Sequence, residues 1–281
     1  MPIDTHMHLA SSDLVAYPHA SDKPLETDKY VNTAESFLQL MDGAGVDGAL
    51  VVQAFGLYGF DNSYHADSAA KYPVRFAGVC GLSPFVPDAP GLLRYWIRER
   101  GMAGLRVSFY GANGLELDEN SPEVLSLLEE ATALNVPVCF LTTRKNLAAV
   151  HAISKKFPGL RIALDHLGVV LGKPERVRGD LLALAPAPNI YLKFSTPILT
   201  AGPEHLKLFH DVIGRFGVHR LMWGTDFPHT NVGGYTNMVN IARNALSHFT
   251  ATEQHALFDG TAASLWPQLS RAKAPARDTP G

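Results

Sequence analysis

The stretch Ile3-Asp4-Thr5-His6-Met7-His8 begins the chain with a short strand-like run that ends in two histidines. Side chains at positions i and i+2 of a strand point to the same side, so His6 and His8 can grip one ion or one carbonyl oxygen together. Further along, Leu164-Asp165-His166 and Trp223-Gly224-Thr225-Asp226 place a histidine and a carboxylate at the ends of two more apolar runs. These four groups at strand ends predict one assembled site.

The rest of the chain alternates apolar strand patterns with helical periodicity, which indicates parallel strands joined by crossover helices. The predicted strands are residues 2–6, 48–53, 76–81, 102–108, 137–142, 161–166, 190–195 and 220–225. Helices are predicted at residues 33–44, 89–99, 121–134, 147–157 and 204–216. Eight strands are what a closed barrel needs, so we predict a single α/β domain, a (β/α)8 TIM barrel, over residues 1–270. The Pro-, Ala- and Arg-rich composition of residues 271–281 predicts a disordered tail.

Composition narrows the classes of partner. The chain has 281 residues, 46% of them hydrophobic and 18% charged, as in an ordinary globular protein with a full core. A formal net charge of -3 provides no electrostatic footprint for nucleic acid or an acidic membrane surface. No signal peptide or membrane-spanning run is visible, so a cytoplasmic protein with a small-molecule substrate is expected, and a homo-oligomer stays open. The cysteines, Cys80 and Cys139, are interpreted as small buried hydrophobes.

A barrel brings the carboxyl ends of all its strands to one mouth. On that map several polar side chains stand where apolar ones are expected, namely His6, His8, Arg106, His166, Lys193 and Asp226. Other histidines, such as His65, are interpreted as structural. Lys193 interrupts an apolar strand and could either reach the mouth, where it would be a substrate contact, or extend to the outer layer of the barrel.

The two histidines after strand one, Asp165-His166-Leu167-Gly168 at strand six and Trp223-Gly224-Thr225-Asp226-Phe227-Pro228-His229 at strand eight resemble the amidohydrolase superfamily over nearly the whole chain. The resemblance is to the amidohydrolase-2 type, and within it to the lactonase branch, which includes 2-pyrone-4,6-dicarboxylate lactonase, sulfomuconolactone hydrolase and sugar lactonases. It implies the barrel fold and a hydrolytic or decarboxylating activity. It also implies that Asp226 is the general base and that His6, His8 and His166 are metal ligands or carbonyl polarisers.

Departures from the superfamily pattern refine this expectation. Strand four carries Arg106 where binuclear members place a bridging Lys or Glu, and strand five lacks their histidine, which argues against two metals. The missing strand-five histidine also disfavours the alternative function, a metal-dependent non-oxidative decarboxylase. Arg106 matches the carboxylate-binding arginines of the branch, and Arg144 is a second candidate anion contact.

The predicted chemistry is hydrolysis of a lactone of a small, carboxylate-bearing molecule. Asp226 would take the proton of the attacking water and pass it to the leaving alkoxide, and the histidines would polarise the carbonyl. Two versions stay open: one divalent ion, with Zn²⁺ favoured, held by His6, His8 and Asp226, or a metal-independent site. A catalytically silent barrel that binds a small anion is the other class of protein considered.

The segment after strand two is rich in glycine, aromatic and amide residues, as a ligand-binding loop would be. Within it, Tyr58 and Asn62 are the predicted substrate contacts. His229 is expected to orient the strand-eight loop rather than to bind metal. Asp4 and Asp165 directly precede predicted ligands, so strand alternation assigns them to the opposite face with structural roles.

Overall fold

The computed structural model describes residues 2–20, 32–109, 117–169 and 173–272. Eight parallel strands in consecutive order form one sheet. The strands are β1 (Ile3–Met7), β2 (Gly48–Val52), β3 (Phe76–Gly81), β4 (Gly104–Ser108), β5 (Val138–Leu141), β6 (Ile162–Leu164), β7 (Ile190–Ser195) and β8 (Leu221–Gly224). All eight predicted strands are confirmed, with ends that move by no more than about two residues. The tail prediction covers mostly residues 273–281, which lie outside the described residues.

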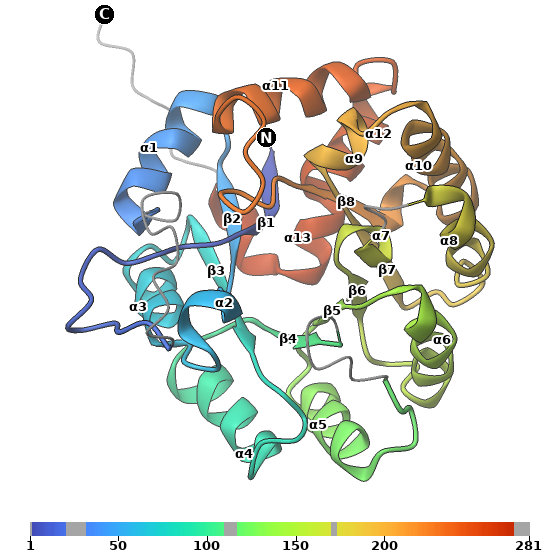
Figure 1. Ribbon diagram of the computed structural model, residues 1–281. Coiled ribbons are helices and arrows are strands. Elements are labelled where there is room, and N and C mark those ends of the chain that lie inside the picture. The colour runs from blue at the N-terminus through green and yellow to red at the C-terminus, as the bar shows by residue number, and fades with distance from the viewer. Residues whose placement is uncertain (1, 21–31, 110–116, 170–172, 273–281) are drawn as a thin grey trace, which may run out of the picture.

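The sheet closes where the ends of β1 and β8 meet. The Asp226 amide donates to the His6 carbonyl at 2.7 Å, and the His8 amide donates to the Phe227 carbonyl at 2.8 Å. Met7 and Phe227 also form an isolated parallel bridge. The strands therefore form the centre of a (β/α)8 barrel, with the helices around them (Figure 1). The closure lies at the carboxyl ends, where the candidate site is expected.

Helices cover the outside of the barrel and its two ends. They are α1 (Ala34–Ala44), α2 (Phe55–Tyr58), α3 (Ser63–Lys71), α4 (Ala89–Arg94), α5 (Pro122–Ala133), α6 (Leu147–Lys156), α7 (His166–Val169), α8 (Pro174–Leu182), α9 (Thr196–Thr200), α10 (Pro203–Phe216), α11 (Tyr235–Leu246), α12 (Ala251–His255) and α13 (Thr261–Leu265). Short π-helical or 3₁₀ segments follow or join them at η2 (Tyr95–Glu99), η3 (Arg144–Asn146), η4 (Val218–Arg220), η5 (Ala256–Gly260) and η6 (Pro267–Ala272). Of the helices, α7 lies at the mouth and α13 lies beneath the inner layer of the barrel.

Two helices begin at the capping residues that the sequence predicts. Thr33 caps α1 by accepting from the Ser36 amide, and Ser121 caps α5 by accepting from the Val124 amide, with Pro122 in the first turn. In the part of the chain that the structure describes, no helix is at once long and apolar enough to cross a membrane.

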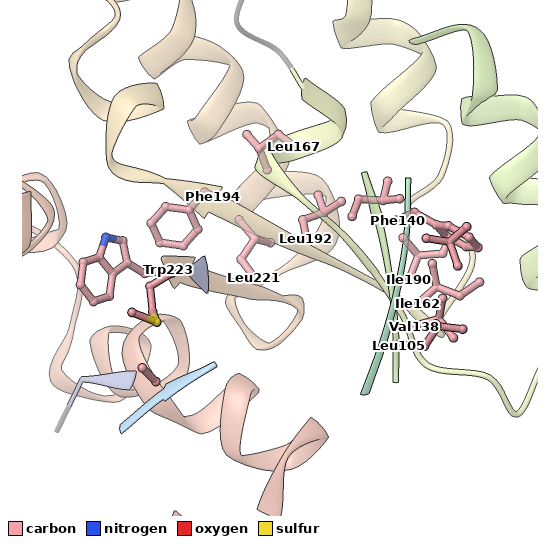
Figure 2. Close-up of a cluster of buried hydrophobic side chains, with 14 of the residues drawn as sticks. Leu105, Val138, Phe140, Ile162, Leu167, Ile190, Leu192, Phe194, Leu221 and Trp223 are labelled. Atoms are coloured by element: carbon pink, nitrogen blue, oxygen red, sulfur yellow. The ribbon is translucent and has the colours of Figure 1, made fainter. Parts of the chain in front are cut away.

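Strand alternation divides the core into an outer and an inner layer. Outward residues such as Leu192, Phe194 and Leu221 are buried against the helices (Figure 2). The inner layer mixes small residues such as Ala77, Cys139 and Ala163 with larger ones such as Met222, and it is closed at the amino-terminal end by Trp266 and its neighbours. The Trp266 indole donates to the Ala103 carbonyl at 3.1 Å, which fixes this floor.

His65 on α3 is a buried histidine whose two ring nitrogens lack a hydrogen-bond partner among the described residues. Burial, and next the neighbouring His8, lowers the pKa of His65 to about 3. The unfolded chain should hold this proton at its ordinary pKa near about 6.5. As pH falls below about 6.5, the unfolded state therefore binds a proton at His65 that the folded state does not bind. The free energy of unfolding then falls by roughly 1.4 kcal/mol per pH unit until the pH reaches the folded-state pKa.

Between about pH 6.5 and 4, we expect the free energy of unfolding of His65→Leu to fall less steeply with decreasing pH than that of the wild type. The difference in slope should correspond to about one proton. Denaturant unfolding across that range measures the slope, and the exposed His219 replaced by Leu is the matched control. Parallel curves for wild type and His65→Leu would refute the assignment.

Candidate active site

A β-bulge in β1 turns both histidines toward the mouth. The register between β1 and β2 shifts between Asp4 and Met7. In a regular strand Ile3 and Met7 would face the same side, but Ile3 faces the inner layer and Met7 packs in the outer core. The bulge therefore changes which residues of β1 point into the barrel. His6 and His8 then share the inner side, as their spacing predicts.

Close contact with β8 fixes His6 further. A Cβ atom on Gly224 would lie 2.8 Å from the His6 amide nitrogen, so only glycine lets the two strands approach this closely. Thr5 Oγ1 donates to the Trp223 carbonyl at 2.7 Å in the same region. The close packing of β8 against β1 thus explains why glycine occupies position 224.

Asp4 faces away from the mouth and holds the turn that carries Asp226. Its carboxylate accepts from the Thr225 amide at 2.8 Å and from the Thr225 hydroxyl at 2.6 Å, and Tyr235 donates to it at 3.3 Å. Burial raises the pKa of Asp4 to about 6 against the effect of these hydrogen bonds. Asp226 itself has a left-handed backbone with φ of 64°, a sparsely populated conformation for a residue with a side chain. The anchored turn is what keeps it there.

Three imidazoles surround one oxygen of Asp226. Asp226 Oδ1 lies 3.7 Å from His6 Nε2, 3.5 Å from His8 Nε2 and 3.7 Å from His166 Nε2. The other oxygen accepts from the Thr230 hydroxyl at 3.0 Å. Burial opposes ionisation of Asp226, but the neighbouring histidines, His166 first, hold its pKa below the usual range. The structure therefore brings together the four residues that the sequence places at strand ends.

The tautomers of the two strand-one histidines can be inferred from their second ring nitrogens. His8 Nδ1 lies 2.8 Å from the Val52 carbonyl, which can only accept, so the proton is on Nδ1. His6 Nδ1 lies 3.3 Å from Asp165 Oδ1, which favours the same tautomer. Burial holds the pKa of His6 well below its usual range, so the ring is neutral. Both Nε2 atoms then present lone pairs toward Asp226, and His6 Nε2 is buried without a hydrogen-bond partner among the described residues.

This donor set fits a metal ion. Ligand atoms from His6, His8 and Asp226 all lie within 4.8 Å of one another. Tetrahedral Zn²⁺ with bonds near 2.0–2.1 Å needs nitrogen and oxygen ligands about 3.4 Å apart, close to the separations given above. Backbone and carboxylate acceptors on the outer nitrogens are also the usual support of metal-bound histidines. Three lone-pair atoms facing each other without a proton between them would otherwise repel.

Asp165 lies beneath the histidines, and the expectation that it faces away from the site is wrong. It accepts from Arg106 Nε at 2.9 Å, lies 3.0 Å from Lys193 Nζ, and contacts His6 as described. Burial opposes ionisation of this carboxyl group, yet the Lys193 ammonium group, the neighbouring His6 imidazole and the Arg106 guanidinium hold its pKa well below the usual range. Asp165 therefore orients His6 and fixes Arg106.

The residues of β6 that point into the barrel differ from those that the sequence predicts. Ala163 belongs to the inner layer and Leu164 to the outer one, so alternation directs Asp165 inward. His166 should then face outward, but its left-handed backbone, with φ of 51°, is followed by two more left-handed residues that turn the chain toward the mouth. Sequence alone carries no signal for that turn beyond Gly168.

The other predicted contacts lie in different places. Lys193 is inside the barrel, 1% exposed, between Asp165 and the ring of Trp266, which rules out the outer layer. Asn62 donates to the carbonyls of Phe60 and Gly81 and accepts from the Gly81 amide, so its amide group holds the loop to β3.

Tyr58 and Arg144 also have partners outside the histidine cluster. The Tyr58 hydroxyl accepts from the Ser11 amide at 2.7 Å, and burial raises the pKa of Tyr58 to about 12. Arg144, in η3 after β5, donates to Asp180 on α8 at an exposed position. Substrate contacts at these residues stay predictions.

The protein is a (β/α)8 barrel in which two histidines and an aspartate form a candidate metal site at the carboxyl ends of β1 and β8. Enzymes with this fold have their active sites at the same end of the barrel. The amidohydrolase family model matches residues 3–268, and the chain belongs to this family.

Two curated relatives act on lactones by name. The chain is 27% identical over 205 residues to L-fucono-1,5-lactonase of Burkholderia ambifaria, covering 70% of each chain. It is 24% identical over 267 residues to 4-sulfomuconolactone hydrolase of Hydrogenophaga intermedia, covering 89% of this chain and 83% of that one.

Solved structures share the fold. A probable 2-pyrone-4,6-dicarboxylic acid hydrolase from Acinetobacter baumannii superposes with a TM-score of 0.77 at 20% identity, over 95% of this chain and 99% of that one. A 2,6-dihydroxybenzoate decarboxylase from Rhizobium gives 0.72 at 15% identity, over 95% and 98%. An amidohydrolase from Burkholderia multivorans with bound zinc gives 0.71 at 19% identity, over 95% and 99%.

Proposed function

We propose that the protein is a lactonase, which hydrolyses the cyclic ester of a small molecule. The observation that carries the proposal is the convergence of three imidazole Nε2 atoms on one oxygen of Asp226 at the mouth of the barrel. The names of the two curated relatives, both hydrolases of lactones, support this reaction class.

The residues divide the chemistry between them. Asp226 is 20% exposed at its side chain, so it can reach a water in the mouth. Its carboxylate takes the proton from that water as it attacks the ester carbonyl, then returns the proton to the alkoxide that leaves when the ring opens. His166, whose Nε2 lies 3.7 Å from the same oxygen, is the proposed group that polarises the carbonyl.

His6, His8 and Asp226 would hold one divalent cation, for which we propose Zn²⁺. When bound, the ion would polarise the carbonyl and lower the pKa of water. Arg106, fixed by Asp165 at the end of β4, is the proposed anchor for a carboxylate of the substrate.

We expect the purified protein to bind one Zn²⁺ per chain, and His8→Ala to weaken that binding at least about 100-fold, since removal of mere outer-shell partners already costs 10–100-fold. Metal analysis after dialysis against a graded chelator measures the loss. His229→Ala is the control, because this ring packs beside His8 at 5.1 Å without belonging to the ligand set. Equal zinc retention in the His8 and His229 variants would contradict the assignment.

The function is tested in a pH-stat with five- and six-membered lactones, some bearing carboxylates. Lactone hydrolysis releases a proton at neutral pH, whereas decarboxylation of a carboxylate consumes one and releases carbon dioxide. Acid release dependent on the protein supports the proposal. Silence on lactones together with carbon dioxide from hydroxybenzoates would replace it with the decarboxylase alternative.

A further inference from the structure

A small apolar cavity adjoins the histidine cluster on the side of the β1, β2 and β8 loops. Its volume is about 50 Å³. The residues that line it include His8, Ala10, Ala54, Leu57, Pro228 and His229. His8 thus belongs both to the cavity wall and to the group of atoms around Asp226, which joins the cavity to the reaction centre.

The cavity walls are built before any ligand arrives. Ala10, Ala54 and Leu57 form a separate buried cluster with Tyr58. The Tyr58 hydroxyl holds the Ser11 amide, and the Leu57 carbonyl accepts from the Ala20 amide at 2.8 Å.

Asn32 holds the other end of the β1 loop. It donates from Nδ2 to the His8 carbonyl at 2.8 Å, and its carbonyl accepts from the Ala10 amide at 3.0 Å. These bonds explain why the loops do not collapse into the space.

The size and lining of the cavity define the group that it takes. An apolar protein cavity of about 150 Å³ accommodates benzene, so a cavity one third of that volume suits one or two carbon atoms. The polar groups in the lining are the imidazoles of His8 and His229, and the alanine, leucine and proline walls supply no hydrogen-bond partner. A hydroxyl or carboxylate directed at these apolar walls would be desolvated there without compensation.

We propose that this cavity binds a methyl or ethyl substituent carried by the lactone ring next to the scissile ester. The inference rests on the proposed function and narrows its substrate class. The cavity would select a lactone with an alkyl branch on a carbon that flanks the ester group. It would discriminate against rings that carry a hydrogen or a hydroxymethyl group at that position.

The test compares matched six-membered lactones that differ in one substituent: hydrogen, methyl or hydroxymethyl, placed either beside the carbonyl or on the carbon bonded to the ring oxygen. In at least one position we expect the methyl compound to exceed the unsubstituted one in kcat/KM by roughly tenfold or more. We expect the hydroxymethyl compound to lack this advantage.

Filling the cavity should remove the preference. In Ala54→Leu, the ratio of methyl to unsubstituted kcat/KM should fall toward one, and Ala54→Val is a milder substitution if the leucine variant folds poorly. Ala148→Leu, on the exposed face of α6, is the matched control and should keep the wild-type ratio.

The outcomes separate the two proposals. Equal hydrolysis of all compounds by the wild type would overturn the alkyl subsite and leave the lactonase proposal standing. A preference for hydroxymethyl over methyl would do the same. Absence of hydrolysis of every lactone would overturn the proposed function, and the subsite with it.

Discussion

Replacement of Asp226 with Asn is expected to lower kcat for lactone hydrolysis by at least roughly 100-fold while the chain still folds. The amide is nearly the same size and can still accept from Thr230, but it cannot take a proton from water. Steady-state rates in the pH-stat, beside a thermal melt, measure the two effects. Asp42→Asn is the control, because Asp42 pairs with Arg75 on the surface and its side chain is 64% exposed.

This variant also separates the lactonase from a catalytically silent barrel. In a barrel that only binds an anion, Asp226→Asn would leave ligand binding unharmed and there would be no turnover to lose. A residual rate near that of the wild type would refute the role of Asp226 as base. Metal content measured on the same preparation shows whether lost zinc accounts for a part of the fall.

Replacement of Asp165 with Asn is expected to lower the free energy of unfolding by roughly 3–5 kcal/mol. Lys193 is 1% exposed and Asp165 is fully buried, so the change leaves a buried ammonium group without its carboxylate. Arg106 loses its partner at the same time. Denaturant unfolding at neutral pH measures the change.

Two comparisons sharpen this prediction. Asp67→Asn removes the surface partner of Arg100 and should cost about 1 kcal/mol or less. A double variant, Asp165→Asn with Lys193→Met, removes both charges of this pair and leaves only Arg106 without its partner. It should regain part of the loss, because the cost lies in the uncompensated charge. If Asp165→Asn were as mild as Asp67→Asn, the buried network would have no such role.

The strand ends and the four central residues could be predicted from sequence because they depend on local patterns. Apolar runs fixed the strands, and the barrel then converted His6, His8, His166 and Asp226 into neighbours. The position of Asp165 could not be obtained in this way. The β1 bulge and the left-handed turn at His166 change which residues face inward, and alternation alone does not reveal either feature.

Loop contacts were the least predictable part of the site. Asn62 looked like a ligand-binding amide, yet its hydrogen bonds hold its own loop to the Gly81 end of β3. Likewise, Tyr58 supports the wall of the apolar cavity through the Ser11 amide. Such roles depend on how three loops far apart in sequence meet, so no single stretch of the chain encodes them.

In the proposed reaction, water held at Asp226 attacks the carbonyl of a lactone. The most direct measurement is the mass spectrum of the hydroxy acid formed by the protein in water enriched in oxygen-18 during a single turnover. We expect one heavy oxygen in the product, located in the new carboxylate. Label in the hydroxyl group, or a product that has lost carbon dioxide, would contradict it.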